Sequence, residues 1–531
     1  MNPEGLVTAL ADPACYPHAP RTVRLVQTHL SVVCLADQLV YKLKKAVTLP
    51  FVDFAPLAAR RRACRDEVRL NRRACPDVYL GTAALRRRAD GGLRFAPLGD
   101  DEGPDDVDCA VVMRRLPQER MLDELLRAHA VTRDEIEALA AHVAAFHARC
   151  EVLPAAAGAA LVDDLLQFAT ANFTELAAIA GHGQPPSLLA ALRSAHERAF
   201  AALAPQLRAR AQRGSCIDGH GDLHARNVCM TVPPALYDCI EFEPRFRCGD
   251  QALDVAFLVM DLRYRGAGDL AAAFVRAYAN ARGDAELPAL LPTLCAYRAM
   301  VRAKVAVFAA HEAELPAADR DGARQSARHH LELAAALQVE ATGPLWLVLC
   351  GPPASGKSQL AAALASRAGW PVLATDVVRK QLAGLAPTER ARAEHYTPAF
   401  SQRTYDALLA RAAAATGDGA RVVLLDGNFA TPAQRAAAAT AASAAGARIV
   451  FGYVAIDRAT AIARATARAQ DPARVSDADA AVAAARHDAF VPPTPAEGRA
   501  LVHIDGNAAP TAMCAALLTG AQEPTSPPCD R

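Results

Sequence analysis

"LWLVLCGPPASGKS", residues 345–358, places a glycine-rich turn directly after an apolar run that is typical of a buried strand. The turn, from Gly351 to Ser358, matches the pattern G-x-x-x-x-G-K-[ST], and a helical pattern follows it. Gly351 and Gly356 allow the backbone N–H groups to face phosphate oxygens, and the helix start adds its positive dipole end. We therefore predict that Lys357 reaches the β- and γ-phosphates of ATP and that Ser358 ligates Mg²⁺.

Strands and helices alternate along the rest of this half of the chain. Helical segments separate five apolar strands, which we predict at residues 345–350, 371–376, 421–427, 447–457 and 500–505. Such alternation is typical of an α/β fold with a doubly wound parallel sheet. We predict a P-loop kinase domain over residues 339–520, after a short linker, and a disordered tail over residues 521–531.

Two further strand ends carry candidate catalytic residues. The stretch "VVLLDGNF" ends in the single acid Asp426, a candidate Mg²⁺ ligand, and favours a small-molecule or polynucleotide kinase over a motor-type ATPase. In "TDVVRK", Asp376 and Arg379 are three residues apart and share one helix face. Asp376 could accept the proton of a hydroxyl acceptor, and Arg379 could hold a substrate anion. The alternative is that Asp376 only caps the helix and Arg379 is a solvated charge.

Three arginines follow in "DRATAIARATARAQDPAR", residues 457–474. Arg464, Arg468 and Arg474 suit a lid that closes over the transferring phosphoryl group. The alternative is a solvated basic helix face. Residues 345–505 resemble the P-loop kinases that include the polynucleotide 5′-hydroxyl kinases and the gluconate kinases. In the polynucleotide kinases an Asp-x-x-Arg after the second strand supplies the general base and a phosphate clamp, and this resemblance implies those roles for Asp376 and Arg379.

A second polar loop, "GHGDLHARNV", occupies residues 219–228. Protein-kinase-like enzymes place a catalytic Asp five residues before a metal-binding Asn, and Asp222 and Asn227 have that spacing. A short predicted hairpin then leads to Asp238, eleven residues beyond Asn227, where an acid can hold Mg²⁺ from the other side. In this interpretation Asp222 orients and deprotonates the acceptor hydroxyl. Glu241 is an alternative to Asp238 as the metal ligand.

The lysine and glutamate that grip ATP in such enzymes also have candidates upstream. Lys42 lies in the strand-like stretch "VYKLKK", and Glu67 lies in the helical stretch "RDEVRL". Lys44 points to the same strand face as Lys42, so it remains an alternative. The flap before these lysines, "THLSVVCLADQLV", contains no glycine, although Ser31 could contribute there.

Residues 22–310 resemble the aminoglycoside phosphotransferases and choline kinases, whose loop H-G-D-x-H-x-x-N is matched from His220 to Asn227. The order of the two halves resembles a bacterial two-domain family often labelled aminoglycoside phosphotransferase/ATP-binding proteins. The resemblance implies an α+β protein-kinase-like domain over residues 1–338, followed by the P-loop domain. His220, Asp250 and Asp254 are then expected to support the loop, the two acids through hydrogen bonds to its backbone.

Two other functions remain open at this stage. His220, Asp222 and His224 alternate, as the ligands of a zinc hydrolase would on a strand, but no second histidine cluster supplies the remaining ligands. Alternatively, one domain is a nucleotide-binding regulator of the other, and the flap without glycine makes the N-terminal domain the regulator in that case.

Composition narrows the classes of protein further. The 531 residues carry a formal charge of +1, so no global basic field indicates nucleic acid, although a nucleic-acid 5′-hydroxyl remains an acceptor candidate for the C-terminal domain. We see no signal peptide and no apolar run of about 18 residues, and we predict no membrane partner. The 14 scattered cysteines indicate a reducing cytoplasm. We predict that the protein uses ATP, Mg²⁺ and an unidentified hydroxyl acceptor; oligomeric state leaves no readable pattern.

Overall fold

The computed structural model describes residues 3–28, 30–49, 52–179, 186–312, 315–386, 388–468 and 479–522. Contacts between Cα atoms divide the chain into two compact units. Unit 1 contains residues 1–165 and 204–288, and unit 2 contains residues 166–203 and 289–531. The divisions fall inside three long helices, α5 (Ala155–Ala178), α6 (Pro186–Gln212) and α10 (Leu287–His311). The domain boundary expected at residues 338–339 stays a prediction, and here residues 289–338 group with the P-loop half.

Unit 1 begins with a six-stranded antiparallel sheet in the order β1-β2-β3-β8-β6-β7. Its strands are β1 (Val23–Gln27), β2 (Ser31–Ala36), β3 (Leu39–Lys44), β6 (Tyr79–Arg87), β7 (Leu93–Pro97) and β8 (Asp106–Arg114). Because side chains alternate along a strand, Tyr41 and Leu43 of β3 enter the core on one face of the sheet. Val40 enters the core on the other face, which Lys42 and Lys44 share.

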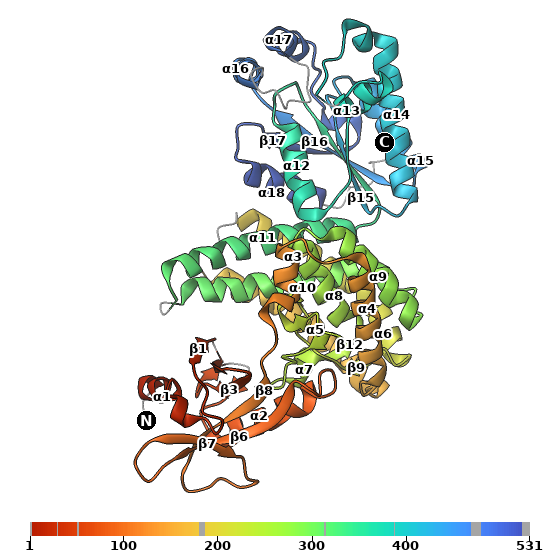
Figure 1. The fold of residues 1–531 in the computed structure, drawn as a ribbon. Coiled ribbons are helices and arrows are strands. Elements are labelled where there is room, and N and C mark those ends of the chain that lie inside the picture. Colours follow the sequence, from red (N-terminus) through yellow and green to blue (C-terminus); the bar gives the residue numbers. More distant parts are fainter. Residues whose placement is uncertain are drawn as a thin grey trace. The chain divides into compact units, whose positions relative to one another are not determined.

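Helix α2 (Leu57–Asn71) packs on that second face, beside β8 and β6 (Figure 1). Among its buried residues, Cys64 is followed by Glu67 and Val68 at three and four positions, and Asn71 follows these two at four and three, so all four lie along one stripe of the helix. Cys64 and Val68 join the hydrophobic core, while Glu67 and Asn71 bring polar groups to the same stripe. The sequence pattern therefore aims a carboxylate at the face of the sheet that carries both lysines.

The rest of unit 1 is mostly helical and carries the "GHGDLHARNV" loop. Besides α2, the α-helices that lie wholly within the unit are α1 (Pro3–Leu10), α3 (Leu122–Arg127), α4 (Arg133–Arg149), α7 (Pro244–Arg247), α8 (Ala252–Tyr264) and α9 (Gly268–Arg282). Short strand pairs flank the loop: β9 (Cys216–Asp218) with β12 (Cys248–Asp250), and β10 (Val228–Cys229) with β11 (Ala235–Leu236). The pair β4 (Thr48–Leu49) and β5 (Val52–Asp53) precedes α2. The hairpin predicted after the loop is confirmed as β10 and β11.

Unit 2 contains a five-stranded parallel sheet in the order β14-β15-β13-β16-β17. Its strands are β13 (Leu345–Cys350), β14 (Val372–Ala374), β15 (Val422–Asp426), β16 (Arg448–Ala455) and β17 (Ala500–Asp505). Every residue of β13 is buried, because this strand lies at the centre of the sheet with both faces covered. The doubly wound parallel sheet predicted for this half is confirmed.

Helices cover both faces of the unit 2 sheet, as Figure 1 shows. The helices here are α11 (Ala317–Ala341), α12 (Lys357–Ala368), α13 (Thr375–Leu382), α14 (Pro398–Gly417), α15 (Pro432–Ala444), α16 (Arg458–Arg468), α17 (Ala480–Asp488) and α18 (Pro510–Ala521). Apolar residues of α13, α14 and α15 form one core with β13 and β15. On the other face α12 contacts α18, and α11 contacts both.

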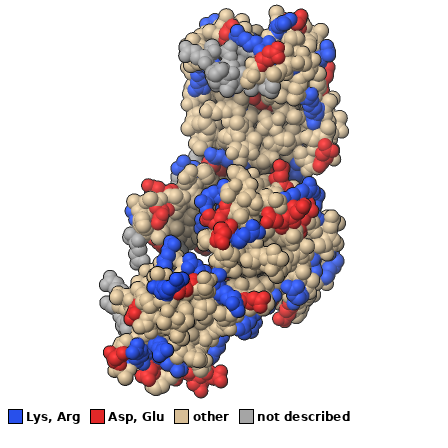
Figure 2. Space-filling view, viewed as in Figure 1, with Lys and Arg blue, Asp and Glu red and all other residues tan. Residues whose placement is uncertain are grey.

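The surface charges are mixed in sign, as the formal charge of +1 suggests. Blue and red residues are interspersed over the face drawn in Figure 2, without a single extended field of one sign. Across the described ranges, no helix has both the length and the hydropathy that a bilayer crossing requires.

A buried ion-pair cluster joins three segments of unit 1. Arg210, near the end of α6, donates to Asp250 Oδ2 at 2.7 Å and to Asp284 Oδ2 at 2.7 Å, and its side chain is only 3% exposed. Two residues earlier, Arg208 pairs with Asp163 at 2.6 Å, but both of those side chains are exposed.

We predict that Arg210→Met destabilises the protein by about 3–5 kcal/mol, because it leaves two carboxylates without their buried cation. Arg208→Met is the matched control, and an exposed pair should contribute at most about 1 kcal/mol. Urea unfolding followed by far-ultraviolet circular dichroism measures both. Equal effects of the two substitutions would show that the buried cluster contributes no more than a surface pair.

Candidate functional site

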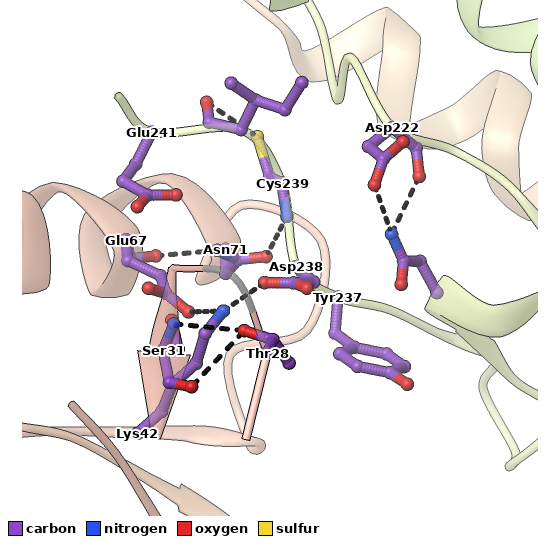
Figure 3. Close-up of polar contacts among 12 residues, drawn as sticks. Thr28, Ser31, Lys42, Glu67, Asn71, Asp222, Tyr237, Asp238, Cys239 and Glu241 are labelled. Atoms are coloured by element: carbon purple, nitrogen blue, oxygen red, sulfur yellow. Dashed lines mark hydrogen bonds and ion pairs between the residues drawn. The ribbon is translucent and has the colours of Figure 1, made fainter. Parts of the chain in front are cut away.

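Both candidate lysines of unit 1 bind the same glutamate. Lys42 Nζ donates to Glu67 Oε1 at 2.9 Å and also contacts the carboxylate of Asp238 (Figure 3). Lys44 Nζ donates to Glu67 Oε2 at 2.5 Å and also contacts the carboxylate of Glu241. The sequence offered Lys42 or Lys44, and Asp238 or Glu241, as alternatives. The structure joins all four of these side chains to Glu67 in one network.

Burial separates the network into an inner and an outer ion pair. The side chains of Lys44, Glu67 and Glu241 are 3%, 0% and 4% exposed. The side chains of Lys42 and Asp238 are 14% and 41% exposed. Only the outer pair, Lys42 with Asp238, can therefore meet a ligand without rearrangement of the inner pair, Lys44 with Glu241.

The opposite charges of the network shift the pKa values of Glu67 and Lys42. Burial alone would raise the pKa of Glu67, but the ammonium groups of Lys42 and Lys44 outweigh burial and lower that pKa to about 2. Burial would lower the pKa of Lys42, but Asp238, Glu67 and Glu241 hold it well above its ordinary value. With all five groups ionised, three carboxylates face two ammonium groups. The network then carries a net charge of −1.

Asp238 occupies an unusual backbone conformation, with a φ of 63°. Aspartate tolerates this left-handed region better than most residues, at some cost in energy. The Asp238 N–H donates to the Tyr79 hydroxyl at 3.1 Å. The next N–H, of Cys239, donates to Asn71 Oδ1 at 2.9 Å (Figure 3). Asn71 Nδ2 in turn donates to the Glu67 carbonyl at 2.8 Å. Helix α2 thus fixes the segment that carries Asp238.

Asp222 and Asn227 lie together on the neighbouring loop. Asn227 Nδ2 donates to the Asp222 carbonyl at 2.9 Å and to Asp222 Oδ2 at 3.0 Å. The Tyr237 N–H donates to the Asn227 carbonyl at 3.1 Å, so the loop is joined to the segment that leads into Asp238. Figure 3 shows Asp222 on a separate segment of chain from Asp238 and Lys42. The five-residue spacing seen in the sequence thus places an acid and an amide in direct contact.

Asp254 braces this loop from α8, as predicted. Its carboxylate accepts the N–H of His220 at 2.7 Å and the N–H of Gly221 at 2.8 Å. His147 Nε2 lies 3.4 Å from Asp254 Oδ2, and His147 Nδ1 lies 2.7 Å from the Tyr278 hydroxyl. Burial would raise the pKa of Asp254, but these partners lower it to about 2.

The other two residues expected to support the loop, His220 and Asp250, make different kinds of contact. His220 uses both ring nitrogens inside the loop, with Nε2 3.0 Å from the Tyr237 carbonyl and Nδ1 3.3 Å from the Asp222 N–H. Those contacts leave its ring no nitrogen to offer a zinc ion. For Asp250 the expectation of direct bonds to the loop backbone is corrected, because its carboxylate binds Arg210 and the N–H of Ala252. Asp250 acts instead through β12, which pairs with β9 just before the loop.

In unit 2 the P-loop connects β13 to α12 as the sequence predicted. A Cβ atom at Gly351, where φ is 147°, would lie 2.5 Å from the Val454 carbonyl oxygen, so this position requires glycine. Lys357 Nζ donates to the carbonyls of Gly351 and Pro352 at 2.9 and 2.7 Å. Burial lowers the pKa of Lys357, with Asp426 opposing this effect.

The predicted metal-side residues lie beside that lysine. Burial raises the pKa of Asp426, which Lys357 and a hydrogen bond from Ser358 oppose. A cavity of about 390 Å³ opens over the P-loop, and Gly356, Lys357, Ser358, Arg464 and Arg468 are among its lining residues. Two of the three predicted lid arginines therefore face the P-loop, in place of a purely solvated helix face. Arg474 lies outside the described residues.

The sequence pair Asp376 and Arg379 is on α13. The N-cap of this helix is Ala374, so Asp376 is in the first turn and does not cap it. Arg379 is buried and donates to the His395 carbonyl at 2.7 Å, so it is not a solvated charge. Its guanidinium lies 4.7 Å from the ring of Tyr396, and the guanidinium of Arg486 lies 5.1 Å from the same ring.

Several residues of these sites were missed at the sequence level. Asn71 follows Glu67 by four residues on a helical pattern, so the spacing could have indicated it. Tyr79, His147, Tyr396 and Arg486 carry no pattern that sets them apart, because only the tertiary fold brings them to the sites.

We predict that Asp254→Asn lowers stability by about 1–3 kcal/mol at pH 7, because an amide cannot replace a carboxylate that accepts two buried N–H groups. The folded pKa of Asp254 is about 2, below the usual value of about 3.9. Its stabilising effect is therefore complete above about pH 4 and is lost as pH falls toward 2. Calorimetric unfolding at pH 7 and pH 3 should show the gap between wild type and variant narrowing at pH 3. A constant gap would contradict this role.

Comparison with known proteins places the chain among relatives. A family model described as "AAA domain" matches residues 347–493. "Uncharacterized protein Rv2004c" of Mycobacterium tuberculosis and "Uncharacterized protein Mb2027c" of Mycobacterium bovis are each 32% identical over 417 residues, or 78% of this chain and 79% of the relative.

Two solved structures are similar to parts of the chain. A choline/ethanolamine kinase family protein from Mesorhizobium loti is 14% identical, with a TM-score of 0.38, and covers 62% of this chain and 94% of its own. A gluconokinase from Sinorhizobium meliloti 1021 is 16% identical, with a TM-score of 0.25, and covers 34% of this chain and 91% of its own. The chain belongs to the same family as the two mycobacterial proteins, and its residues 347–493 match the AAA-domain model.

Proposed function

We propose that this protein is an ATP- and Mg²⁺-dependent phosphotransferase with one nucleotide site in each unit. The observation that carries the proposal is the cavity of about 390 Å³ over the P-loop, lined by Lys357, Ser358 and two arginines. Phosphate oxygens placed there would meet three cationic side chains and the start of α12. The buried Asp426, bonded to Ser358, supplies the acid that a Mg²⁺ site needs.

In unit 1 we assign the outer ion pair to the nucleotide. Lys42 would contact the phosphates, Glu67 would orient Lys42, and Asp238 with the amide oxygen of Asn227 would hold Mg²⁺. The bound metal would neutralise charge on the phosphate oxygens. Because Lys42 and Asp238 contact each other in the present structure, nucleotide binding would separate them. The network has three acids for two lysines, which favours the arrival of a cation together with ATP.

Asp222 is the proposed base of unit 1. Its Oδ2 accepts a hydrogen bond from Asn227, and its side chain is 32% exposed, so the carboxylate is both oriented and reachable. The acceptor hydroxyl would give its proton to Asp222 as its oxygen forms a bond to the γ-phosphorus and the bond to ADP breaks. In unit 2 the corresponding base is Asp376.

The surroundings of Asp376 favour an acceptor that carries an anionic group. Arg379 and Arg486 both lie against Tyr396, and the contacts of Arg379 described here are to neutral groups, including the His395 carbonyl and the Tyr396 ring. A buried guanidinium group held by neutral partners, such as that of Arg379, gains most from a phosphate or carboxylate. A phosphorylated small molecule and a nucleic-acid end both meet this requirement.

A second candidate function is that unit 1 binds nucleotide only to regulate unit 2. The flap between β1 and β2 favours this alternative. The Thr28 hydroxyl accepts the Ser31 N–H at 3.0 Å, and the Thr28 N–H donates to the Ser31 carbonyl at 2.9 Å. These backbone N–H groups are therefore used inside the turn, and they do not face a phosphate as they would in a glycine-rich flap.

We predict that the full-length protein binds two equivalents of Mg·ATP and that Lys357→Ala removes one of them. The same substitution should lower ATP consumption by unit 2 about 100-fold or more, as the loss of a preorganised charge does elsewhere. Titration calorimetry and an ATP-consumption assay measure the two effects. Lys304→Ala, which removes a lysine paired with Glu175, is the control. Unchanged stoichiometry in Lys357→Ala would reject the P-loop assignment.

Substitutions of Asp222 and Asp238 separate enzyme from regulator. Within a Lys357→Ala chain, Asp238→Ala should weaken Mg²⁺-dependent ATP binding, because Asp238 would contact the metal. Asp222→Ala should leave that binding near its starting value and lower phosphoryl transfer about 10²-fold or more, across a panel of hydroxyl acceptors. A chain that binds Mg·ATP, but whose transfer to every acceptor is nil before and after the Asp222 substitution, would be the regulator.

A further inference from the structure

Two lysines bind Glu67, although one lysine would be enough to form a lysine–glutamate ion pair at a phosphate site. Lys42 and Lys44 lie two residues apart on β3, so both project from the same face of the sheet. Each lysine binds a different oxygen of Glu67. The inner lysine, Lys44, has no role in the phosphate contacts proposed above.

We propose that Lys44 is a positioning residue of the unit 1 nucleotide site, which holds Glu67 and Glu241 in place so that Lys42 is presented to the phosphates. This inference rests on the proposed function of unit 1. It adds a second cation, fixed inside the protein, to a grip that otherwise needs one.

The environment of Lys44 explains why it cannot be the lysine that binds phosphate. Its Nζ contacts Glu67 Oε2 and Glu241, and it lies 5.8 Å from the centre of the Phe54 ring. Phe54 is itself held by Arg60, whose Nη1 donates to the Phe54 carbonyl at 2.9 Å. With a side chain only 3% exposed, Lys44 would have to abandon two buried carboxylates to reach a ligand.

Charge balance explains why Lys42 depends on Lys44. Glu67 and Glu241 are both buried, and a buried carboxylate is costly without a cation beside it. If Lys44 were absent, Lys42 would be the remaining ammonium group of the network and would be drawn toward both glutamates. Lys44 balances one negative charge, so that Lys42 needs only Oε1 of Glu67 and remains directed at the outer side, where Asp238 lies.

Lys44 also connects the site to the flap. It pairs with Ser31 in the ladder between β2 and β3, and the N–H of Lys45 donates to the Leu30 carbonyl at 2.7 Å. Leu30 and Ser31, at the turn between β1 and β2, therefore rest on the end of β3. A change in the inner ion pair would reach the flap through the backbone of β3.

The test uses the full-length chain with Lys357→Ala, in which the remaining nucleotide site is that of unit 1. We expect Lys44→Met to weaken ATP binding at least about 10-fold, a bound set below the roughly 30-fold lower end of what truncating one partner of a buried charge pair costs. Because the effect passes through Lys42 and not through the metal, the same factor should appear with Mg²⁺ and with EDTA in its place. Lys45→Met, a substitution of the next residue, is the matched control and should bind ATP normally.

A double variant keeps the inference testable if the single variant folds poorly. Lys44→Met with Glu241→Gln removes the inner cation and one inner charge together, so no isolated pair of buried acids remains. We expect its ATP binding to stay at least about 10-fold weak, because Glu67 Oε2 still lacks its ammonium partner. Binding like that of the parent chain would overturn the proposal, since Lys44 would then only neutralise Glu241. A loss confined to measurements with Mg²⁺ would overturn it as well.

Failure of the proposed function gives a different result. In that case the parent chain, with Lys44 intact, would bind no ATP with or without Mg²⁺. If the parent chain binds ATP and Lys42→Met abolishes the binding while both Lys44 variants bind normally, the proposed function stands and only the role of Lys44 fails.

Discussion

The buried carboxylate of Glu67 is the constraint around which unit 1 is arranged. Removing a carboxylate from water is costly, and here two ammonium groups on one strand compensate for that cost. Each ammonium group also contacts a further acid. Asp238 and Glu241 provide these acids from a segment that begins 171 residues after Glu67. One buried charge therefore ties β3, α2 and residues 238–241 together, and it leaves one lysine and one acid at the accessible side.

Unit 2 holds its lysine in place by a different arrangement. Its P-loop relies on backbone geometry, which a glycine packed against β16 makes available, and on one lysine that bonds to loop carbonyls. The acids and arginines come from the carboxyl ends of neighbouring parallel strands and the helices after them, where ligands of open α/β sheets bind. In unit 1 the lysines form ion pairs with carboxylates, whereas in unit 2 the lysine donates hydrogen bonds to neutral carbonyl groups.

Sequence patterns predicted the arrangement of residues correctly where that arrangement depends on local backbone geometry. The P-loop, the Asp222–Asn227 spacing and the alternation of β3 each place their residues within a few positions, and the structure shows the arrangement that each pattern predicted. The patterns could not choose between Lys42 and Lys44, because both point the same way and the choice depends on how deep each ammonium group is buried. They also missed β6 and β7: the β6 stretch "YLGTAALRR" contains glycine, alanine and arginine where strands usually have β-branched residues. The partner of Asp250 was wrong for a related reason, since Arg210 lies 40 residues away and no spacing rule connects them.

The distance along the chain between Lys42 and Asp238 has a consequence for biogenesis. These residues are 196 positions apart, so the ion pair at the proposed nucleotide site closes a very long loop. Closing such a loop costs entropy before any contact repays it, and long-range contacts form late in folding. A chain emerging from the ribosome cannot assemble this site until the segment beyond Asp238 is synthesised. A nucleotide that binds only the assembled site would stabilise the folded state of completed chains, and truncated or unfinished chains would lack that stabilisation.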